Sequence, residues 1–160
     1  MFKLFSKKDV VKLHSPANGR VIKIEEVNDE MFANKMLGDG FAVQPEGGIV
    51  FSPCVGEVIS IFSTKHAICI KDQNGLEVLV HMGIDTVELD GLPFTIKVKE
   101  GEHVDTSTVI AHMDIKEVLK KEKETDIIVV FTNMDAVETI SIEKSRYVSA
   151  QEIVGELKLK

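Results

Sequence analysis

The chain has 160 residues, of which 44% are hydrophobic and 28% charged, a composition typical of one soluble globular domain with a substantial core. Its formal net charge of −7 argues against nucleic-acid binding, because a phosphate backbone selects basic surfaces, and it suits basic partners. The longest strongly apolar run, residues 127–131, is far too short to span a bilayer, so we expect no stable insertion into a membrane.

The first residues differ in character from the rest. Residues 1–8 are apolar and basic by turns, and one short turn of this kind buries little, so we predict a flexible tail over residues 1–10. Residues 11–160 are predicted to form a single domain. The initial Met and short leader favour a free-standing protein over a domain of a longer chain. The apolar, strand-like surroundings of Cys54 and Cys69 favour reduced thiols and a cytoplasmic location.

Turn residues divide the domain into many short runs with the character of strands. The run SPANGRVIKI, residues 15–24, is echoed by SPCVGEVISI, residues 52–61, and each has an early Pro, a later Gly and then an alternating strand pattern. The echo indicates one β domain built from related halves. Further strands are predicted at residues 41–43, 48–51, 66–70, 77–82, 94–98, 109–113, 127–131 and 156–159.

Helical character is weak and confined to two segments. Residues 29–36 could form a short helix that ends before Gly38, and residues 114–121 a second one that starts from Asp114 as its cap. The predicted fold is therefore all-β, a compact antiparallel β-sandwich or barrel with related halves and one or two short helices.

Two histidines, His66 and His81, lie on neighbouring predicted strands joined by the turn at residues 72–75. If all four turn residues form the loop, Lys71 pairs with Leu76. His66 then lies directly opposite His81, with Cβ atoms roughly 4.5–5.5 Å apart. A two-residue loop would make the histidines diagonal neighbours on the same face. Only an odd loop or a bulge would place them on opposite faces.

Such a pair has a defined chemistry. Thr64 would share the face of His66, and Leu79 that of His81. Two protonated imidazoles would repel each other, so at least one is expected to be neutral near pH 7. A neutral imidazole has a nucleophilic lone pair, and the second imidazole can donate a hydrogen bond to the anion that the first acquires. This pairing suits phosphoryl transfer, which depends on positioning and charge stabilisation.

Other interpretations of the two histidines remain open from the residues alone. Both could be partly buried structural side chains. A zinc site, and with it a zinc hydrolase, would require a third ligand that the spacing does not supply. The other histidines, His14, His103 and His112, are scattered. The chain has neither a Gly-x-Ser-x-Gly elbow nor a phosphate-cradling Gly-x-x-x-x-Gly-Lys loop, which argues against a serine hydrolase and against direct use of ATP.

Several segments resemble one known family, the glucose-type enzyme IIA domain of the bacterial phosphotransferase system. The segment GDGFAV, residues 38–43, resembles its Gly-Asp-Gly signature. TKHA, residues 64–67, and VHMGIDTV, residues 80–87, resemble its two active-site segments, and FTNMD, residues 131–135, resembles a late segment. The motifs occur in order and at the family spacing, and the resemblance extends roughly from residue 11 to 160.

The resemblance implies a phosphocarrier on a compact antiparallel β-sandwich with related halves, a duplicated hybrid motif. His81 would accept a phosphoryl group from the phosphohistidine of the carrier protein HPr and pass it to a cysteine of a sugar-specific IIB domain. His66 would hydrogen-bond the transferred group, and Thr64 would hold the ring of His66. No cofactor is obligatory. Zinc at His66 and His81 is a further hypothesis.

The resemblance also implies a surface for partners. The expected acidic rim consists of Asp39, Asp85 and Asp135, and the expected apolar docking surface of Phe41, Phe62 and Leu79. Basic residues of a partner can be steered to such a rim, which agrees with the acidic net charge. From the residues alone, each aspartate is more simply a turn residue and each apolar residue more simply core.

A regulatory binding protein is the alternative function. The same face could dock on a permease or a metabolic enzyme, and phosphorylation would add about −1.5 to −2 charges to it and so weaken docking. The two functions are compatible, and the sequence does not say which sugar is imported.

Overall fold

The computed structural model describes residues 9–160, so most of the predicted tail lies outside the described residues; Val10, within the predicted tail, already belongs to the first strand. The described strands are β1 (Val10–His14), β2 (Gly19–Lys23), β3 (Asp39–Pro45), β4 (Ile49–Phe51), β5 (Gly56–Ile61), β6 (Ala67–Asp72), β7 (Glu77–Ile84), β8 (Phe94–Ile96), β9 (His103–Val104), β10 (Val109–Met113), β11 (Glu124–Phe131), β12 (Val137–Ile142), β13 (Arg146–Val148) and β14 (Ile153–Leu159). The helices are η2 (Ile24–Glu26), α1 (Glu30–Ala33), η3 (Thr86–Leu89), α2 (Ile115–Lys120) and η4 (Met134–Ala136).

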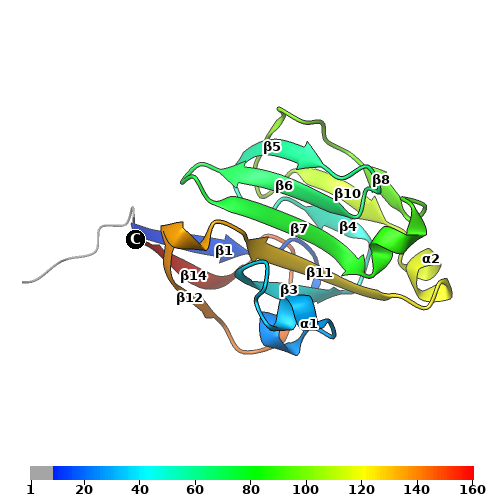
Figure 1. Cartoon of the computed structure of the whole chain (residues 1–160), viewed down its shortest axis with the longest axis horizontal. Coiled ribbons are helices and arrows are strands. Elements are labelled where there is room, and N and C mark those ends of the chain that lie inside the picture. Colours follow the sequence, from blue (N-terminus) through cyan, green and yellow to red (C-terminus); the bar gives the residue numbers. More distant parts are fainter. Residues whose placement is uncertain (1–8) are drawn as a thin grey trace, which may run out of the picture.

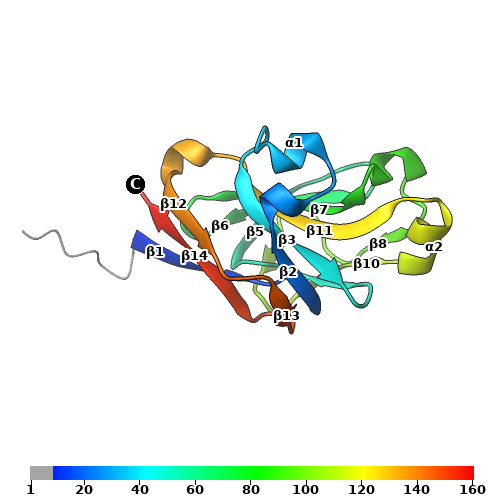
Figure 2. The same ribbon diagram turned by 90° about the horizontal axis from the view of Figure 1, so that it is seen from below.

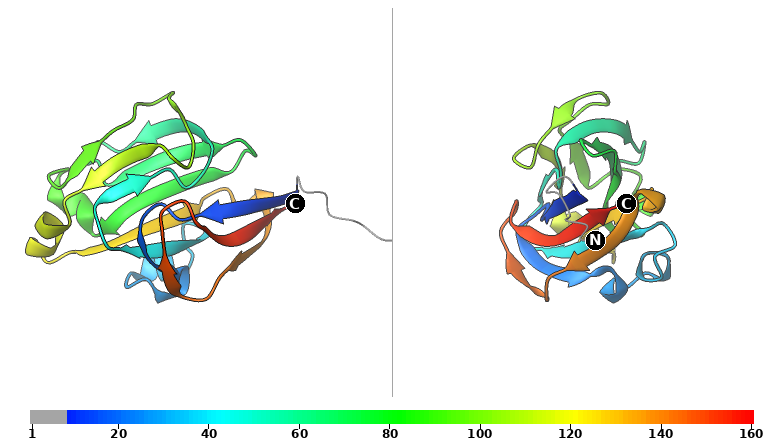
Figure 3. Two further views of the ribbon diagram at one scale, coloured as in Figure 1. Left: turned by 180° about the vertical axis from the view of Figure 1, so that it is seen from behind. Right: turned by 90° about the vertical axis from the view of Figure 1, so that its left-hand side faces the viewer.

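The strands form one large sheet and two small ones, and every pairing is antiparallel (Figure 1). The large sheet has the order β13-β2-β3-β11-β7-β6-β5-β9, and the small sheets have the orders β1-β14-β12 and β4-β10-β8. The views from behind and from the end show the small sheets packed over one face of the large sheet (Figure 3). The predicted all-β sandwich with two short helices is confirmed.

Both faces of the large sheet are buried at its centre, because α1 covers the face opposite the small sheets (Figure 2). Strand β11 shows how burial of both faces is reflected in the amino-acid sequence. Ile127, Val129 and Phe131 point into the main core between the sheets, whereas Ile128 and Val130 point to the other face. A strand buried on both sides needs an unbroken apolar run, and β11 has one. The apolar residues on the α1 side form an outer cluster: Ile22, Ile24, Val27, Phe32, Ala42, Ala67, Leu79, Ile84, Ile128 and Val130.

The sequence echo corresponds to two copies of one local structure. In the first, the Ser15 hydroxyl donates to the carbonyl oxygen of Ala17 over 2.7 Å; in the second, the Ser52 hydroxyl donates to that of Cys54 over 2.6 Å. The glycine that follows each turn begins β2 or β5, and a Cβ on either would lie 2.1 Å from a carbonyl oxygen of the neighbouring strand. Glycine is therefore required in both copies by close approach of the backbones.

The strands predicted from sequence correspond to β2 to β8, β10, β11 and β14, whereas β1, β9, β12 and β13 were not predicted. Strand β9 has two residues and β13 three, too few to show an alternating pattern. Neither α-helix in residues 9–160 has the length and apolar character needed to cross a bilayer.

Candidate functional site

His81 lies near the middle of the large sheet, on the face that α1 covers. Strand β7 pairs with β6 on one side and β11 on the other, and His81 stands opposite Ala67 and Ile128. Both of these neighbours belong to the outer cluster. The half-buried imidazole of His81 is therefore set in an apolar surface on a strand that is hydrogen-bonded on both sides.

The predicted register of the β6–β7 hairpin is wrong. Lys71 pairs with Glu77, which leaves a five-residue loop from Asp72 to Leu76, and Ala67 rather than His66 lies opposite His81. The cause is the side chain of Asp72. Its Oδ1 accepts hydrogen bonds from the amides of Asn74 and Leu76, both over 2.8 Å, and this holds one more residue in the loop than expected.

His66 nevertheless reaches the face of His81, because it precedes β6 and lies in a turn. Lys65 adopts a left-handed conformation with φ of 60°, and its amide donates to the carbonyl oxygen of Phe62 over 2.8 Å. The carbonyl oxygen of His66 then accepts from the amide of Met82 over 2.7 Å. The two imidazole centroids lie 5.0 Å apart, with the ring planes at 76°. The predicted juxtaposition is correct, although it arises from a turn.

The ring of His66 is held from two sides. The Thr64 Oγ1 lies 2.6 Å from its Nδ1, and Phe62 packs edge-on with ring centroids 5.3 Å apart. His66 is only 5% exposed, and this burial lowers its pKa below the usual value, while hydrogen bonding to the Thr64 backbone opposes the shift. A neutral His66 that accepts the Thr64 hydroxyl proton at Nδ1 carries its own proton on Nε2.

The ring of His81 is held in one tautomer by the backbone. Its Nδ1 lies 2.8 Å from the carbonyl oxygen of Gly83, which can only accept, so Nδ1 carries the proton and Nε2 keeps a free lone pair. Burial, and next the proximity of His66, lower the pKa of His81 to about 4, while the Gly83 hydrogen bond and Asp29 act in the opposite direction. His81 is therefore neutral at pH 7 and has a nucleophilic nitrogen.

Helix α1 adds residues to the site that sequence reasoning missed. Asp29 caps the helix by accepting from the amides of Met31 and Phe32 over 2.9 and 3.3 Å. This places Phe32, which is 2% exposed, edge-on against His81 with ring centroids 4.9 Å apart. The sequence identified Asp29 as a helix start, but nothing local indicates that the helix packs over β7. Met36, just beyond α1, is 72% exposed.

The structure corrects two of the expected docking residues. Phe41 is 1% exposed and belongs to the main core, because side chains alternate along β3 and its neighbours Gly40 and Ala42 take the His81 face. Leu79 lies on the His81 face but is 8% exposed and packs in the outer cluster. Of the three predicted apolar residues, Phe62 alone presents a large exposed surface, at 44%.

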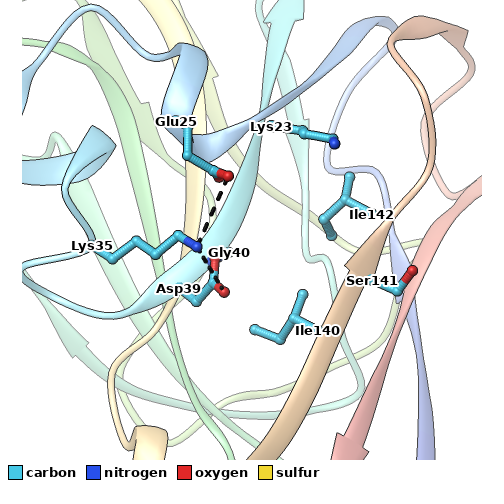
Figure 4. Close-up of a pocket in the computed structure, with 8 residues that line it drawn as sticks. All are labelled: Lys23, Glu25, Lys35, Asp39, Gly40, Ile140, Ser141 and Ile142. Carbon is cyan, nitrogen blue, oxygen red and sulfur yellow. Dashed lines mark hydrogen bonds and ion pairs between the residues drawn. The ribbon is translucent and has the colours of Figure 1, made fainter.

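The expected acidic rim is also divided. Asp39 shares the face of Phe41, and its carboxylate is turned toward Lys35, 3.5 Å away, in a cavity of about 230 Å³ between β3 and β12 (Figure 4). Glu25 also approaches Lys35, at 3.9 Å, and neither histidine lines this cavity. The structure therefore does not bring Asp39 to the histidines.

The other two rim residues are exposed and lie beyond opposite ends of the β7–β11 pair. Asp85 directly follows β7, in a left-handed conformation with φ of 59°, at the end nearer His81. Asp135 lies in η4 beyond the far end of β11, where Phe131 pairs with Val78. Asp85 is thus well placed to border the histidines, whereas the role of Asp135 stays a prediction.

No group of three or more His, Cys, Asp or Glu side chains within residues 9–160 is arranged to hold a metal ion. Two imidazoles make an incomplete zinc site, since zinc usually takes three or four protein ligands. What the described side chains provide is a lone pair on Nε2 of His81 beside a potential N–H donor on His66. Such a pair can accept and stabilise a transferred anionic group.

Comparisons with known proteins are consistent with this geometry. Residues 11–137 match the model of the family described as phosphoenolpyruvate-dependent sugar phosphotransferase system, EIIA 1. The chain is 41% identical over 145 residues to the PTS system glucose-specific EIIA component of Staphylococcus epidermidis, covering 88% of this chain and 87% of that protein. It is 45% identical over 148 residues to the PTS system glucose-specific EIICBA component of Streptococcus pneumoniae, which covers 92% of this chain but only 20% of that longer protein.

A solved structure is similar over almost the whole length. Glucose permease IIA from Mycoplasma capricolum superposes with a TM-score of 0.87 at 35% sequence identity, covering 98% of this chain and 100% of that one. The likeness therefore extends over nearly all of both chains.

Proposed function

The chain belongs to the EIIA 1 family of the phosphoenolpyruvate-dependent sugar phosphotransferase system, and on this basis we propose that it is a phosphocarrier whose acceptor is His81. The group comes from the phosphohistidine of HPr and passes to a cysteine of a sugar-specific IIB domain. The glucose-specific relatives favour a IIB domain of the glucose type. The single observation that carries the proposal is the hydrogen bond between Nδ1 of His81 and the Gly83 carbonyl oxygen, which leaves Nε2 free, and the lowered pKa of His81 agrees with it.

Each transfer exchanges one bond to phosphorus for another. The lone pair on Nε2 of His81 attacks the phosphorus of phospho-HPr; the new N–P bond forms as the bond to the HPr imidazole breaks, and that imidazole keeps the electron pair. In the second transfer, a cysteine thiolate of the IIB domain attacks and the bond to His81 breaks in the same way. Throughout, His66 donates its Nε2 proton in a hydrogen bond to the phosphoryl oxygens, and Thr64 keeps the His66 ring turned for this task.

We expect partners to dock on exposed apolar side chains that belong to the elements next to the two histidines in the fold or in the sequence. These side chains come from α1 and its end, from the turn before His66 and from η3, and we call them the docking patch: Met31, Met36, Leu37, Phe62 and Val87. Asp29 and Asp85 adjoin this patch and supply the negative charge that basic residues of HPr would approach. This set replaces Phe41, Leu79 and Asp39, which the structure buries or turns away.

The test is phosphorylation by enzyme I, HPr and labelled phosphoenolpyruvate, followed by addition of a IIB domain. Wild type should take acid-labile label, and His81→Gln should take none, because amide nitrogen is not nucleophilic. His66→Gln should accept label but pass it on poorly, because His66 acts on the transferred group. Label on His81→Gln equal to that on wild type would show that His81 is not the acceptor.

A second function, regulatory docking of the unphosphorylated protein, is favoured by the exposure of the docking patch beside His81. Met36 is 72% exposed and Val87 50%, and a phosphoryl group on His81 would add about −1.5 to −2 charges next to them. A permease or metabolic enzyme that binds this patch should therefore bind His81→Ala as well as wild type and release the phosphorylated form. Equal binding of phosphorylated and unphosphorylated protein would exclude this control.

Zinc would bind only at an interface between this protein and a partner. His66 and His81 supply two nitrogen ligands, so we propose zinc binding only where a partner's carboxylate completes the site. Competition between zinc and HPr for the protein is the measurement. Zinc that binds the isolated protein tightly without affecting HPr would show a site elsewhere.

A further inference from the structure

The carbonyl group that fixes the tautomer of His81 lies in an irregular piece of backbone. Gly83 has φ of 80° and Asp85 φ of 59°, so the backbone departs from the regular extended conformation two residues after the acceptor. The ladder to β11 is also interrupted here, because the register shifts between Glu124 and Ile127. The regular hydrogen bonds of a sheet therefore do not set the direction of the Gly83 carbonyl, and other contacts must hold it.

Thr86 makes those contacts. It is fully buried at the start of η3, and its hydroxyl donates to the carbonyl oxygen of Met82 over 2.5 Å. Its methyl group packs on the α-carbon of Gly83, since a Cβ built on that glycine would lie 2.4 Å from Thr86 Cγ2. One side chain thus holds both the peptide unit that precedes Gly83 and the α-carbon of Gly83 itself.

The residue that Thr86 holds also connects the two histidines. The amide of Met82 donates to the carbonyl oxygen of His66 over 2.7 Å, and its own carbonyl oxygen accepts from Thr86. A change at Thr86 therefore reaches His81 through Gly83, and it reaches the backbone of His66 through Met82.

We propose that Thr86 is a positioning residue for phosphoryl transfer, which keeps the Gly83 carbonyl aimed at Nδ1 of His81 and so keeps the lone pair on Nε2. Its consequence for transfer rests on the proposed function, whereas its consequence for the His81 tautomer does not. The two imidazoles are hydrogen-bonded to Thr64 and Gly83, and the Thr86 hydroxyl to Met82, so Thr86 acts through the backbone.

The test compares two substitutions that each remove half of the Thr86 side chain's interactions. Thr86→Val keeps the shape but has no hydroxyl, so the buried oxygen of Met82 loses its donor. We expect the ¹⁵N spectrum of His81 to change from one tautomer to a mixture, and the rate of transfer from phospho-HPr to fall about 10-fold, as for other partners that orient a functional histidine. Thr86→Ser keeps the donor and should retain the wild-type tautomer and most of the rate.

Ser52→Ala is the matched control, because it too removes a buried hydroxyl that donates to a backbone carbonyl, but in the connection between β4 and β5. It should lower the melting temperature and leave the His81 spectrum and the transfer rate unchanged. If Thr86→Val behaves like this control, Thr86 is only structural and the proposal is wrong. If wild type accepts no phosphoryl group while Thr86→Val still changes the tautomer, the proposed function fails but the positioning role stands.

Discussion

His81 and His66 meet on one face of the large sheet, but different kinds of backbone carry them there. His81 belongs to a strand that is paired on both sides, and its Nδ1 is hydrogen-bonded to the main-chain carbonyl oxygen of Gly83. His66 lies in a turn that depends on the left-handed conformation of Lys65, and its Nδ1 is hydrogen-bonded to the side-chain hydroxyl of Thr64. The acceptor is therefore carried by a paired strand and oriented by the main chain, whereas its helper is carried by a turn and oriented by the Thr64 hydroxyl.

This comparison predicts that the His81 side tolerates backbone changes least. In Gly83→Ala, the new Cβ would lie 2.4 Å from Thr86 Cγ2 and 2.9 Å from the carbonyl oxygen of Glu124, at a φ of 80°. We expect the free energy of unfolding to fall by about 4 kcal/mol, at the upper end for single substitutions, in urea denaturation.

Gly75→Ala is the control for the backbone strain alone. Gly75 has a similar φ of 86° in the β6–β7 loop, but a Cβ there would meet nothing within 4 Å. Its cost should be only about 1–2 kcal/mol, the penalty of a left-handed residue with a side chain. Equal losses for the two variants would show that the packing of Thr86 against Gly83 contributes nothing.

The next effect concerns the dependence of stability on pH. Because the pKa of His81 falls from 6.5 to about 4 on folding, the unfolded state binds more protons between these values. The stability that neutral His81 contributes is thus fully present above pH 6.5 and is lost as the pH falls to about 4, a change of about 3 kcal/mol.

The measurement is the difference in unfolding free energy between wild type and His81→Gln across this range. Subtraction is necessary because burial raises the pKa of Asp126 to about 6, which stabilises the fold as the pH falls and so opposes the effect of His81. The difference should decline steadily from pH 6.5 to 4. A constant difference would mean that His81 titrates alike in the folded and unfolded chains.

The sequence predicted the strand that carries His81 better than the turn that carries His66. The apolar runs of β11 and β7 reflect burial on both faces of the sheet, which leaves a pattern in the residues themselves. The loop at Asp72 and the left-handed Lys65 depend on single hydrogen bonds and single torsion angles, which leave no repeating pattern. The five-residue loop shifts the register of the hairpin, and the turn before β6 brings the ring of His66 back to the face of His81. Because these two departures from the expected hairpin compensate for each other, the two imidazoles lie side by side as predicted.

The docking residues show the same division. The family resemblance implies a docking role for Phe41, yet the strand period places it in the main core. Phe32 and Asp29, which do reach His81, belong to a four-residue helix whose position is decided by tertiary packing. Burial by a distant element is not encoded in the local pattern of residues 29–36.

The smallest predicted effect is on the His66 side, at Lys65. A β-branched residue is strongly disfavoured at the left-handed φ of 60° that Lys65 adopts, so Lys65→Val should lower stability by about 1–2 kcal/mol. Lys65→Gly removes the charge without this strain and should cost less. Lys71→Val, on the exposed face of β6, should be neutral because valine suits a strand.

The consequence for function separates the two histidines. If the turn serves only to deliver His66, Lys65→Val should accept label from phospho-HPr at close to the wild-type rate, since Nδ1 of His81 is still held by the Gly83 carbonyl oxygen and Nε2 stays free. It should then pass the group to the IIB domain more slowly, as expected for His66→Gln, because a displaced imidazole no longer donates to the phosphoryl oxygens. Slower acceptance with normal donation would reverse the assignment of roles, because it would mean that the turn controls the nucleophile and not its helper.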